Sequence, residues 1–298
     1  MLYHQLGKSI LRVSEIGFGC MSLGTDDAEN ARLIHYATDC GINLFDTADL
    51  YNHGQNEITV GKALKGKRKD VIIATKVGNQ WRTDGSGWDW NPRKEYILAS
   101  VEESLKRLQT DYIDLYQLHG GTIEDPIDET IEAFEILLQQ GKIRYYGISS
   151  IRPNVIRKYV ERSGIVSVMM QYSLLDRRPE EACLALLREN KIGILARGAI
   201  AKGLLAGKAP EPYLNYSKDE VATAAGVVQQ LSADGRTCAQ TALRFVLQQP
   251  GITTAVAGMR TQQQLEDVLS TLSSRSLSAI EIQSLQRSLP GNTYDQHR

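Results

Sequence analysis

Short apolar runs and amphipathic stretches alternate along almost the whole chain. Runs of this kind between turn signals predict β-strands, and apolar positions at helical spacing predict helices. The predicted strands are Ile16–Gly19, Ile42–Phe45, Val71–Thr75, Ile113–Leu118, Tyr145–Ile148, Val166–Gln171, Gly193–Ala196 and Thr253–Ala257. The predicted helices are Asp27–Cys40, Gln55–Leu64, Arg93–Gln109, Pro126–Gln140, Pro153–Arg162, Pro179–Asn190, Thr237–Gln248 and Gln262–Leu272. This alternation predicts an α/β protein with a parallel sheet, and eight repeats favour a closed (β/α)8 TIM barrel over an open sheet.

Two further elements lie outside that repeat. The segments Tyr3–Leu6 and Leu11–Ser14 flank a Gly-containing turn, which predicts an N-terminal β-hairpin that caps the bottom of the barrel. Residues Ser278–Ser288 predict an extra C-terminal helix. No low-complexity linker divides the chain, so we expect residues 1–298 to form a single domain.

The least regular stretches are Gly78–Asn91 and Gly198–Ser217. Both follow the ends of predicted strands. We therefore expect them to be loops on the catalytic face of the barrel.

Charge and cysteine content exclude several classes of function. The 298 residues include 34 basic and 35 acidic side chains, for a formal net charge of −1. This balance offers no footprint for nucleic acid or an anionic membrane, and no apolar run approaches the ~20 residues of a membrane span. Four widely spaced cysteines without C-x-x-C spacing, and no secretory signal, favour a cytoplasmic protein that holds no metal. Monomer and weak homo-oligomer both remain open.

Four chemically active side chains follow predicted strands. Asp46 and Tyr51 come after the second strand, Lys76 ends the third, and His119 ends the fourth. Because all strand C-termini of a parallel barrel point to one face, these side chains should converge there. Taken singly, each has another interpretation: a capping aspartate, a packing tyrosine, a surface lysine and an ordinary histidine.

Together the four side chains suit proton transfer. A free tyrosine has a pKa near ~10, and a lysine held close should lower the pKa of Tyr51. Asp46 would keep Lys76 charged and oriented, and His119 would donate a hydrogen bond to a substrate oxygen. Such a site would protonate an alkoxide as hydride reduces a carbonyl, a form of catalysis typically worth ~10²–10⁴ in rate.

Several motifs in order along the chain resemble the aldo-keto reductases. They are Phe45–Glu57 (FDTADLYNHGQNE), Ala74–Lys76, Asp111–His119, Ile143–Ser150, Met169–Glu180, Lys202–Lys208 and Gly251–Val268. The resemblance is greatest to a bacterial branch related to potassium-channel β-subunits and stress-induced reductases. It implies that Tyr51 is the proton donor and that Asp46, Lys76 and His119 complete a catalytic tetrad.

The cofactor expected from this resemblance is NADPH/NADP⁺. No G-x-G-x-x-G follows a strand, and we interpret the G-x-x-x-x-G-K at Gly61–Lys67 as a helix end that is not a phosphate-binding loop. Near the nicotinamide and pyrophosphate, the resemblance implies Gly19, Cys20, Met21, Asp46, Ser149, Gln171, Arg197, Gly198, Ala199, Ile200, Lys202, Gly203 and Leu204. At the adenosine end it implies Gly258, Met259, Arg260, Gln264 and Asp267.

Two arginines bear on the cofactor. Arg260 favours NADP because a guanidinium binds a 2′-phosphate through paired hydrogen bonds; the alternative is a solvated loop arginine. Arg197 stands where relatives commonly carry a tyrosine that stacks on the nicotinamide. We hypothesise that Arg197 stacks on the reduced ring and favours release of NADP⁺; the alternative is that it turns away to a carboxylate.

The substrate is expected to be an aldehyde or ketone with an apolar or aromatic part. The loop after Lys76 carries Trp81, Trp88 and Trp90, and aromatic side chains on a catalytic-face loop form an apolar wall. We expect Met21, Tyr51, Trp81 and His119 to line the pocket. Sugars remain open as substrates, and one or two of the tryptophans have the alternative role of pinning the loop to the barrel.

Three functions compete at this point. The first is an NADPH-dependent aldehyde or carbonyl reductase. The second is an NADPH-binding regulatory or sensor subunit with little turnover. The third is a barrel isomerase or aldolase in which Lys76 forms a Schiff base, and the neighbouring Asp46 argues against it because a nucleophilic amine must be neutral.

Overall fold

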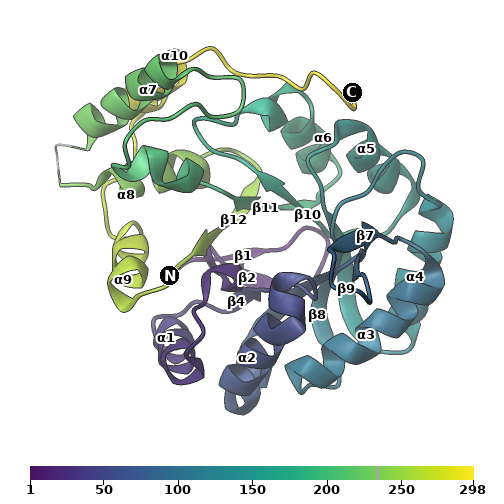
Figure 1. The fold of residues 1–298 in the computed structure, drawn as a ribbon. Coiled ribbons are helices and arrows are strands. Elements are labelled where there is room, and N and C mark those ends of the chain that lie inside the picture. The colour runs from purple at the N-terminus through teal and green to yellow at the C-terminus, as the bar shows by residue number, and fades with distance from the viewer. Residues whose placement is uncertain (233–234) are drawn as a thin grey trace.

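Eight parallel strands close into a barrel in the computed structural model, which describes residues 1–232 and 235–298 (Figure 1). The order around the barrel is β10-β11-β12-β3-β4-β5-β8-β9. The strands are β3 (Ile16–Gly19), β4 (Leu44–Asp46), β5 (Ile72–Val77), β8 (Ile113–Leu118), β9 (Ile143–Ser149), β10 (Ser167–Gln171), β11 (Gly193–Arg197) and β12 (Ile252–Gly258). The predicted TIM barrel is confirmed, and every predicted strand overlaps a strand of this barrel.

Helices surround the barrel on the outside (Figure 1). They are α1 (Asp27–Asp39), α2 (Gln55–Leu64), α3 (Lys94–Leu108), α4 (Ile127–Gln139), α5 (Pro153–Arg162), α6 (Cys183–Glu189), α7 (Lys218–Leu231), α8 (Cys238–Leu247), α9 (Gln262–Ser270) and α10 (Ala279–Arg287). The sequence pattern had not predicted α7. This helix begins at a capping box, in which the Ser217 side chain binds the backbone N–H of Glu220 and the Glu220 carboxylate binds that of Ser217.

The N-terminal hairpin closes the floor of the barrel, as predicted. It consists of β1 (Tyr3–Gln5) and β2 (Arg12–Ser14). Leu6, Leu11 and Val13 are buried against inward-facing residues of the barrel strands. Gly7 has a φ of +57°, and a Cβ on it would lie 2.1 Å from the carbonyl oxygen of Val166, so only glycine fits this close approach.

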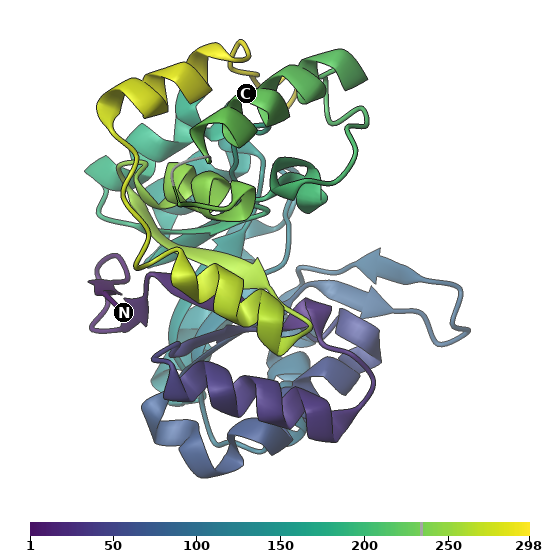
Figure 2. The same cartoon turned by 90° about the vertical axis from the view of Figure 1, so that its left-hand side faces the viewer.

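A second hairpin lies at the opposite end of the barrel (Figure 2). It pairs β6 (Asn79–Trp81) with β7 (Trp88–Trp90) in antiparallel register. The sequence pattern predicted an irregular loop here, which was wrong. The hairpin rises beside the C-terminal ends of β5 and β8, the face where the predicted site lies.

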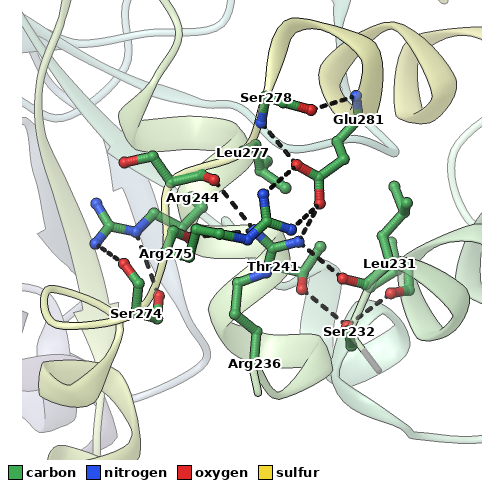
Figure 3. A network of polar contacts seen from close by, with 12 residues as sticks. Leu231, Ser232, Arg236, Thr241, Arg244, Ser274, Arg275, Leu277, Ser278 and Glu281 are labelled. Atoms are coloured by element: carbon green, nitrogen blue, oxygen red, sulfur yellow. Dashed lines mark hydrogen bonds and ion pairs between the residues drawn. The ribbon is translucent and has the colours of Figure 1, made fainter. Parts of the chain in front are cut away.

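The extra C-terminal helix is present as α10, and a buried arginine ties it to its neighbours (Figure 3). Arg236, 5% exposed, donates to the Leu231 carbonyl at the end of α7 and to the Glu281 carboxylate on α10. Arg275 binds the same carboxylate. These contacts anchor the C-terminal segment to the helices beside β11 and β12. Across the described chain, no helix combines the length and apolar character that a membrane crossing requires.

Candidate active site

A buried ion pair forms the centre of the predicted site. Lys76, 1% exposed, lies near the end of β5, and Asp46 is the last residue of β4. The Lys76 ammonium donates to Asp46 Oδ1 at 2.8 Å, to Asp46 Oδ2 at 2.7 Å and to the carbonyl oxygen of Thr47 at 2.7 Å. Burial lowers the pKa of a lysine, but the contacts with Asp46 outweigh it and raise the pKa of Lys76 above its ordinary value. Lys76 is therefore a cation, which removes the neutral amine that a Schiff base needs.

Tyr51 is presented to this pair by a tight turn. It opens the 3-10 turn η2 (Tyr51–Gly54), in which Asn52 and His53 have φ angles of 48° and 53°. These left-handed conformations are uncommon outside glycine. The Tyr51 hydroxyl lies 3.4 Å from the Lys76 ammonium, so tyrosine, lysine and aspartate form one continuous chain of contacts.

The direction of the Tyr51 pKa shift differs from the sequence-based expectation. We had predicted that Lys76 lowers the pKa of Tyr51. Burial instead raises the pKa of Tyr51 above its ordinary value, because desolvation of the phenolate outweighs the attraction of Lys76. Tyr51 therefore keeps its proton at neutral pH, as a proton donor must.

His119 lies beside Tyr51 directly after β8. The two rings meet edge to face with centroids 5.9 Å apart. Burial, with repulsion from Lys76 and Arg197, lowers the pKa of His119 to about 3. Its ring is therefore neutral, and Nδ1 is buried without a hydrogen-bond partner within residues 1–232 and 235–298. The four predicted residues thus converge on one patch.

The three tryptophans of the β6–β7 hairpin have different surroundings. Trp90 donates from Nε1 to Asp125 at 2.9 Å and covers Gly78 and Gly120, so it pins the hairpin to the barrel. Trp81 stacks on His53, with ring centroids 3.7 Å apart. Trp88 is 47% exposed. Trp81 is therefore the tryptophan tied directly to the turn that carries Tyr51.

Most of the residues predicted to hold the cofactor share the C-terminal rim of the barrel. Gly19, Ser149, Gln171, Arg197 and Gly258 are the last residues of β3, β9, β10, β11 and β12. Next to Gly19, the Cys20 side chain is fully buried whereas Met21 is 68% exposed. The rim is continuous with the patch of Asp46 and Tyr51.

The Gln171 side chain makes three hydrogen bonds at this rim. Its amide Nε2 donates to Asp176 at 2.8 Å and to the Tyr213 hydroxyl at 3.0 Å. Its Oε1 accepts from Arg197 Nη1 at 3.1 Å. The exposed Arg197 therefore donates to the side-chain amide of Gln171 in this contact, whereas the alternative from the sequence was a contact with a carboxylate.

The remaining residues predicted to bind the cofactor lie in the segment after β11 and around the start of α9. Of the loop residues, Ala199 and Leu204 are buried, while Gly198 and Lys202 are exposed. Arg260 is exposed next to α9, and its backbone N–H donates to the Gln264 side chain at 2.8 Å. Met259 is fully buried, and its carbonyl oxygen accepts from the Ser22 hydroxyl at 3.0 Å. Asp267 accepts from Thr237 and Gln240, so in this structure it joins α9 to α8.

Three residues near the site had no predicted role. They are Asp49, His53 and Tyr213. Asp49 and His53 lie inside the Asp46–Gly54 segment. Its acidic residues and its Asn-His-Gly turn signal were visible in the sequence. Tyr213 lies in the long segment after β11, and no sequence signal connects it with Gln171.

The rim of this barrel brings together a lysine, an aspartate, a tyrosine and a histidine. This arrangement fits the class of oxidoreductases that the sequence motifs resemble. The model of the Aldo/keto reductase family matches residues 15–289, and the chain belongs to this family. It is 48% identical, over the full length of both chains, to the "Uncharacterized oxidoreductase YqkF" of Bacillus subtilis. It is 34% identical, over 70% of each chain, to the "NADH-specific methylglyoxal reductase" of Escherichia coli.

Among solved structures, the chain resembles the holo form of aldo-keto reductase AKR11C1 from Bacillus halodurans. The TM-score is 0.94 and the identity 51%, with 100% of this chain and 99% of that chain covered. The family resemblance, including its bacterial relatives, is thus confirmed.

Proposed function

We propose that this oxidoreductase uses NADPH to reduce aldehydes or ketones to alcohols, with Tyr51 as the proton donor. The observation that carries the proposal is the chain of contacts from Asp46 through the Lys76 ammonium to the Tyr51 hydroxyl, at 2.7–3.4 Å. As the carbonyl oxygen gains negative charge, it takes the Tyr51 proton, and Lys76 stabilises the phenolate that remains.

Each residue of the tetrad has a distinct task in this scheme. Asp46 keeps Lys76 charged and fixed, at 1% exposure. His119 is neutral, so it can donate one hydrogen bond to the carbonyl oxygen without competing as an acid. The edge-to-face contact with Tyr51 holds the two donors on the same patch.

The rim fits a nicotinamide cofactor, which supplies hydride when bound. Gly258 at the end of β12 is exposed and carries no side chain, so its backbone is accessible at the rim, and a Cβ there would crowd Ser22 at 3.2 Å. Ser149 and Gln171 offer polar groups for the carboxamide, with Arg197 beside Gln171. Gly19, Cys20, Met21 and the segment from Gly198 to Leu204 would flank the nicotinamide and pyrophosphate.

Arg260 supports NADPH as the preferred coenzyme. Its guanidinium is exposed at the start of α9, where a 2′-phosphate would gain paired hydrogen bonds and the favourable helix end. Gln264 and Asp267 lie on the same helix and would complete the adenosine end. Because one relative carries the name NADH-specific, coenzyme choice is part of the test.

The side chains above Tyr51 favour a substrate with a flat apolar part. Trp81 and its stacked partner His53 form an aromatic face on the turn that carries Tyr51. Met21, largely exposed at the rim, adds a flexible apolar side chain. Met21, Trp81, Tyr51 and His119 would together surround the carbonyl compound.

The test is NADPH oxidation with aromatic and aliphatic aldehydes, ketones and sugars, with NADH in parallel. Tyr51→Phe should lower kcat by ~10²–10⁴ while NADPH affinity, from fluorescence titration, stays unchanged. Tyr145→Phe is the control, because this hydroxyl accepts from Ile10 at the floor of the barrel. Full activity in Tyr51→Phe would refute the proton donor. Tight NADPH binding without turnover of any carbonyl would favour the sensor function instead.

A further inference from the structure

A second buried carboxyl, Asp49, lies in the short segment between Asp46 and Tyr51. It is 8% exposed, three residues after Asp46 and two before Tyr51. Its backbone N–H donates to the carbonyl oxygen of Lys76 at 3.4 Å. Its Oδ1 is buried and has no hydrogen-bond partner among the described residues. An ionised carboxylate with a buried, unpaired oxygen is costly, and such a group takes up a proton instead.

The neighbouring ion pair does not neutralise Asp49. Glu57 is fully buried; it accepts from Thr75 Oγ1 at 2.5 Å and from Arg107 Nε at 2.7 Å. Arg107 also fills the space beside Gly54, where a Cβ would meet its Cδ at 2.8 Å. Arg107 is thus committed to Glu57 and to the turn that carries Tyr51.

Among the buried carboxyls in this part of the described chain, Asp49 is the one without an ion-pair partner. Lys76 is bound by both oxygens of Asp46, and Arg107 is bound by Glu57. The Asp49 carboxyl also accepts a hydrogen bond from the backbone N–H of Leu50, and it interacts with two neutral phenols, Tyr96 on α3 and Tyr116 on β8. Arg197, which also attracts Asp46, is bonded to Gln171, so within the described residues none of these three cations forms an ion pair with Asp49.

We propose that Asp49 is a proton-binding positioning residue of this site, neutral in the working enzyme beside the Glu57–Arg107 pair and acting through Lys76 on proton donation by Tyr51. Burial, with repulsion from Glu57, raises the pKa of Asp49 to about 8 against the attraction of Arg107 and Lys76. While Asp49 is neutral, the Lys76 charge acts on Asp46 and Tyr51 without competition from a second carboxylate in the Asp46–Tyr51 segment. Once Asp49 ionises, its negative charge draws on Lys76 and disfavours the Tyr51 phenolate that proton donation creates.

The direction of the pH effect follows from these charges. Tyr51 itself titrates above its ordinary value, so its own proton is not lost first. Turnover should therefore fall as pH rises through the titration of Asp49, near the value of about 8. Asparagine has the shape of a neutral carboxyl and cannot ionise, so Asp49→Asn should keep the activity at neutral pH and lose this alkaline fall.

The experiment measures the single-turnover rate of NADPH oxidation against pH, which separates the chemical step from product release. It rests on the proposed reductase function. We expect the parent rate to fall about three- to tenfold between about pH 7 and about pH 9.5, and the Asp49→Asn rate to change less than about twofold. The exposed Asp111→Asn is the matched control and should follow the parent.

A second readout is independent of activity. In protein labelled with ¹³C at aspartate carboxyls, the resonance that disappears in Asp49→Asn should titrate near pH 8. A resonance that titrates below about pH 5 would overturn the proposal, as would pH profiles of parent and Asp49→Asn that coincide. Absence of turnover in the parent would instead count against the reductase function, and the NMR titration would still decide the protonation state of Asp49.

Discussion

Lys76 is the residue on which the buried charges of the site depend. Lys76→Met should lower the free energy of unfolding by about 3–5 kcal/mol, because it leaves the Asp46 carboxylate buried without its cation. Lys76→Met combined with Asp46→Asn should recover much of this loss, since no charge is then left uncompensated. Urea unfolding of the two variants and the parent measures both effects.

The matched control is the exposed pair of Lys62 and Asp27, whose side chains are 52% and 45% exposed. Solvent screens such a pair, so Lys62→Met should change stability little. If Lys76→Met and Lys62→Met both lowered the free energy of unfolding only slightly, the Lys76–Asp46 pair would not be the buried charge pair described above. Activity should be lost in both Lys76 variants, whatever their stability.

At the same scale, the sequence predicted which residues meet but not how each is protonated. Asp46, Lys76 and His119 could be predicted because each lies at or next to the C-terminal end of a strand, and barrel topology brings strand ends together. The raised pKa of Tyr51 and the burial of Asp49 could not, since both depend on side chains that close over the turn from α2, α3 and β8. Burial outweighed the cation that we had expected to dominate.

Among the elements, the β6–β7 hairpin is held to the barrel by Trp90 together with contacts of Trp81 and Asn79. Trp90 binds Asp125 through Nε1 and packs over Gly78, whose φ is +125°. Trp90→Ala should loosen the hairpin and raise the rate at which trypsin cuts after Arg82, an exposed residue near its tip. Digestion followed by mass spectrometry gives this rate.

Trp88→Ala is the control for the hairpin, because Trp88 is 47% exposed and should leave the cutting rate near that of the parent. Equal rates in Trp90→Ala and the parent would contradict the anchoring role. Because Trp81 lies on the same hairpin, KM for aromatic aldehydes should rise in Trp90→Ala more than kcat falls.

The sequence pattern did not predict α7 or the β6–β7 hairpin, and the reasons differ. The start of α7 carried a readable signal, the Ser217–Glu220 capping box, which was not used. The β6–β7 hairpin carried a Gly-containing turn, but its strands of three residues are too short for a period to show. Its position is set by long-range contacts, above all Trp90 on Gly78 and Gly120, and these are absent from local sequence.

On the scale of the whole molecule, the two ends of the barrel are built from different kinds of side chain. The C-terminal rim holds the buried Lys76–Asp46 pair, the left-handed turn after Tyr51, and the exposed Arg197 and Arg260. The floor holds apolar side chains of the β1–β2 hairpin packed beneath the strands. TIM barrels generally place catalysis at the C-terminal face and stability at the opposite face, and we expect the same division in this chain.

Leu6 allows the two ends to be separated by experiment. It is fully buried in the floor, in a cluster with Leu195 of β11 and Val166, which precedes β10. Leu6→Ala should lower the free energy of unfolding by about 2–5 kcal/mol, through lost burial and the cavity left behind. Urea unfolding should show this loss, while kcat of the folded enzyme and its NADPH affinity stay at the parent values. A clear fall in kcat at a temperature where Leu6→Ala is fully folded would contradict this division, and would mean that the packing of the floor governs the geometry of Asp46, Tyr51 and Lys76 at the opposite rim.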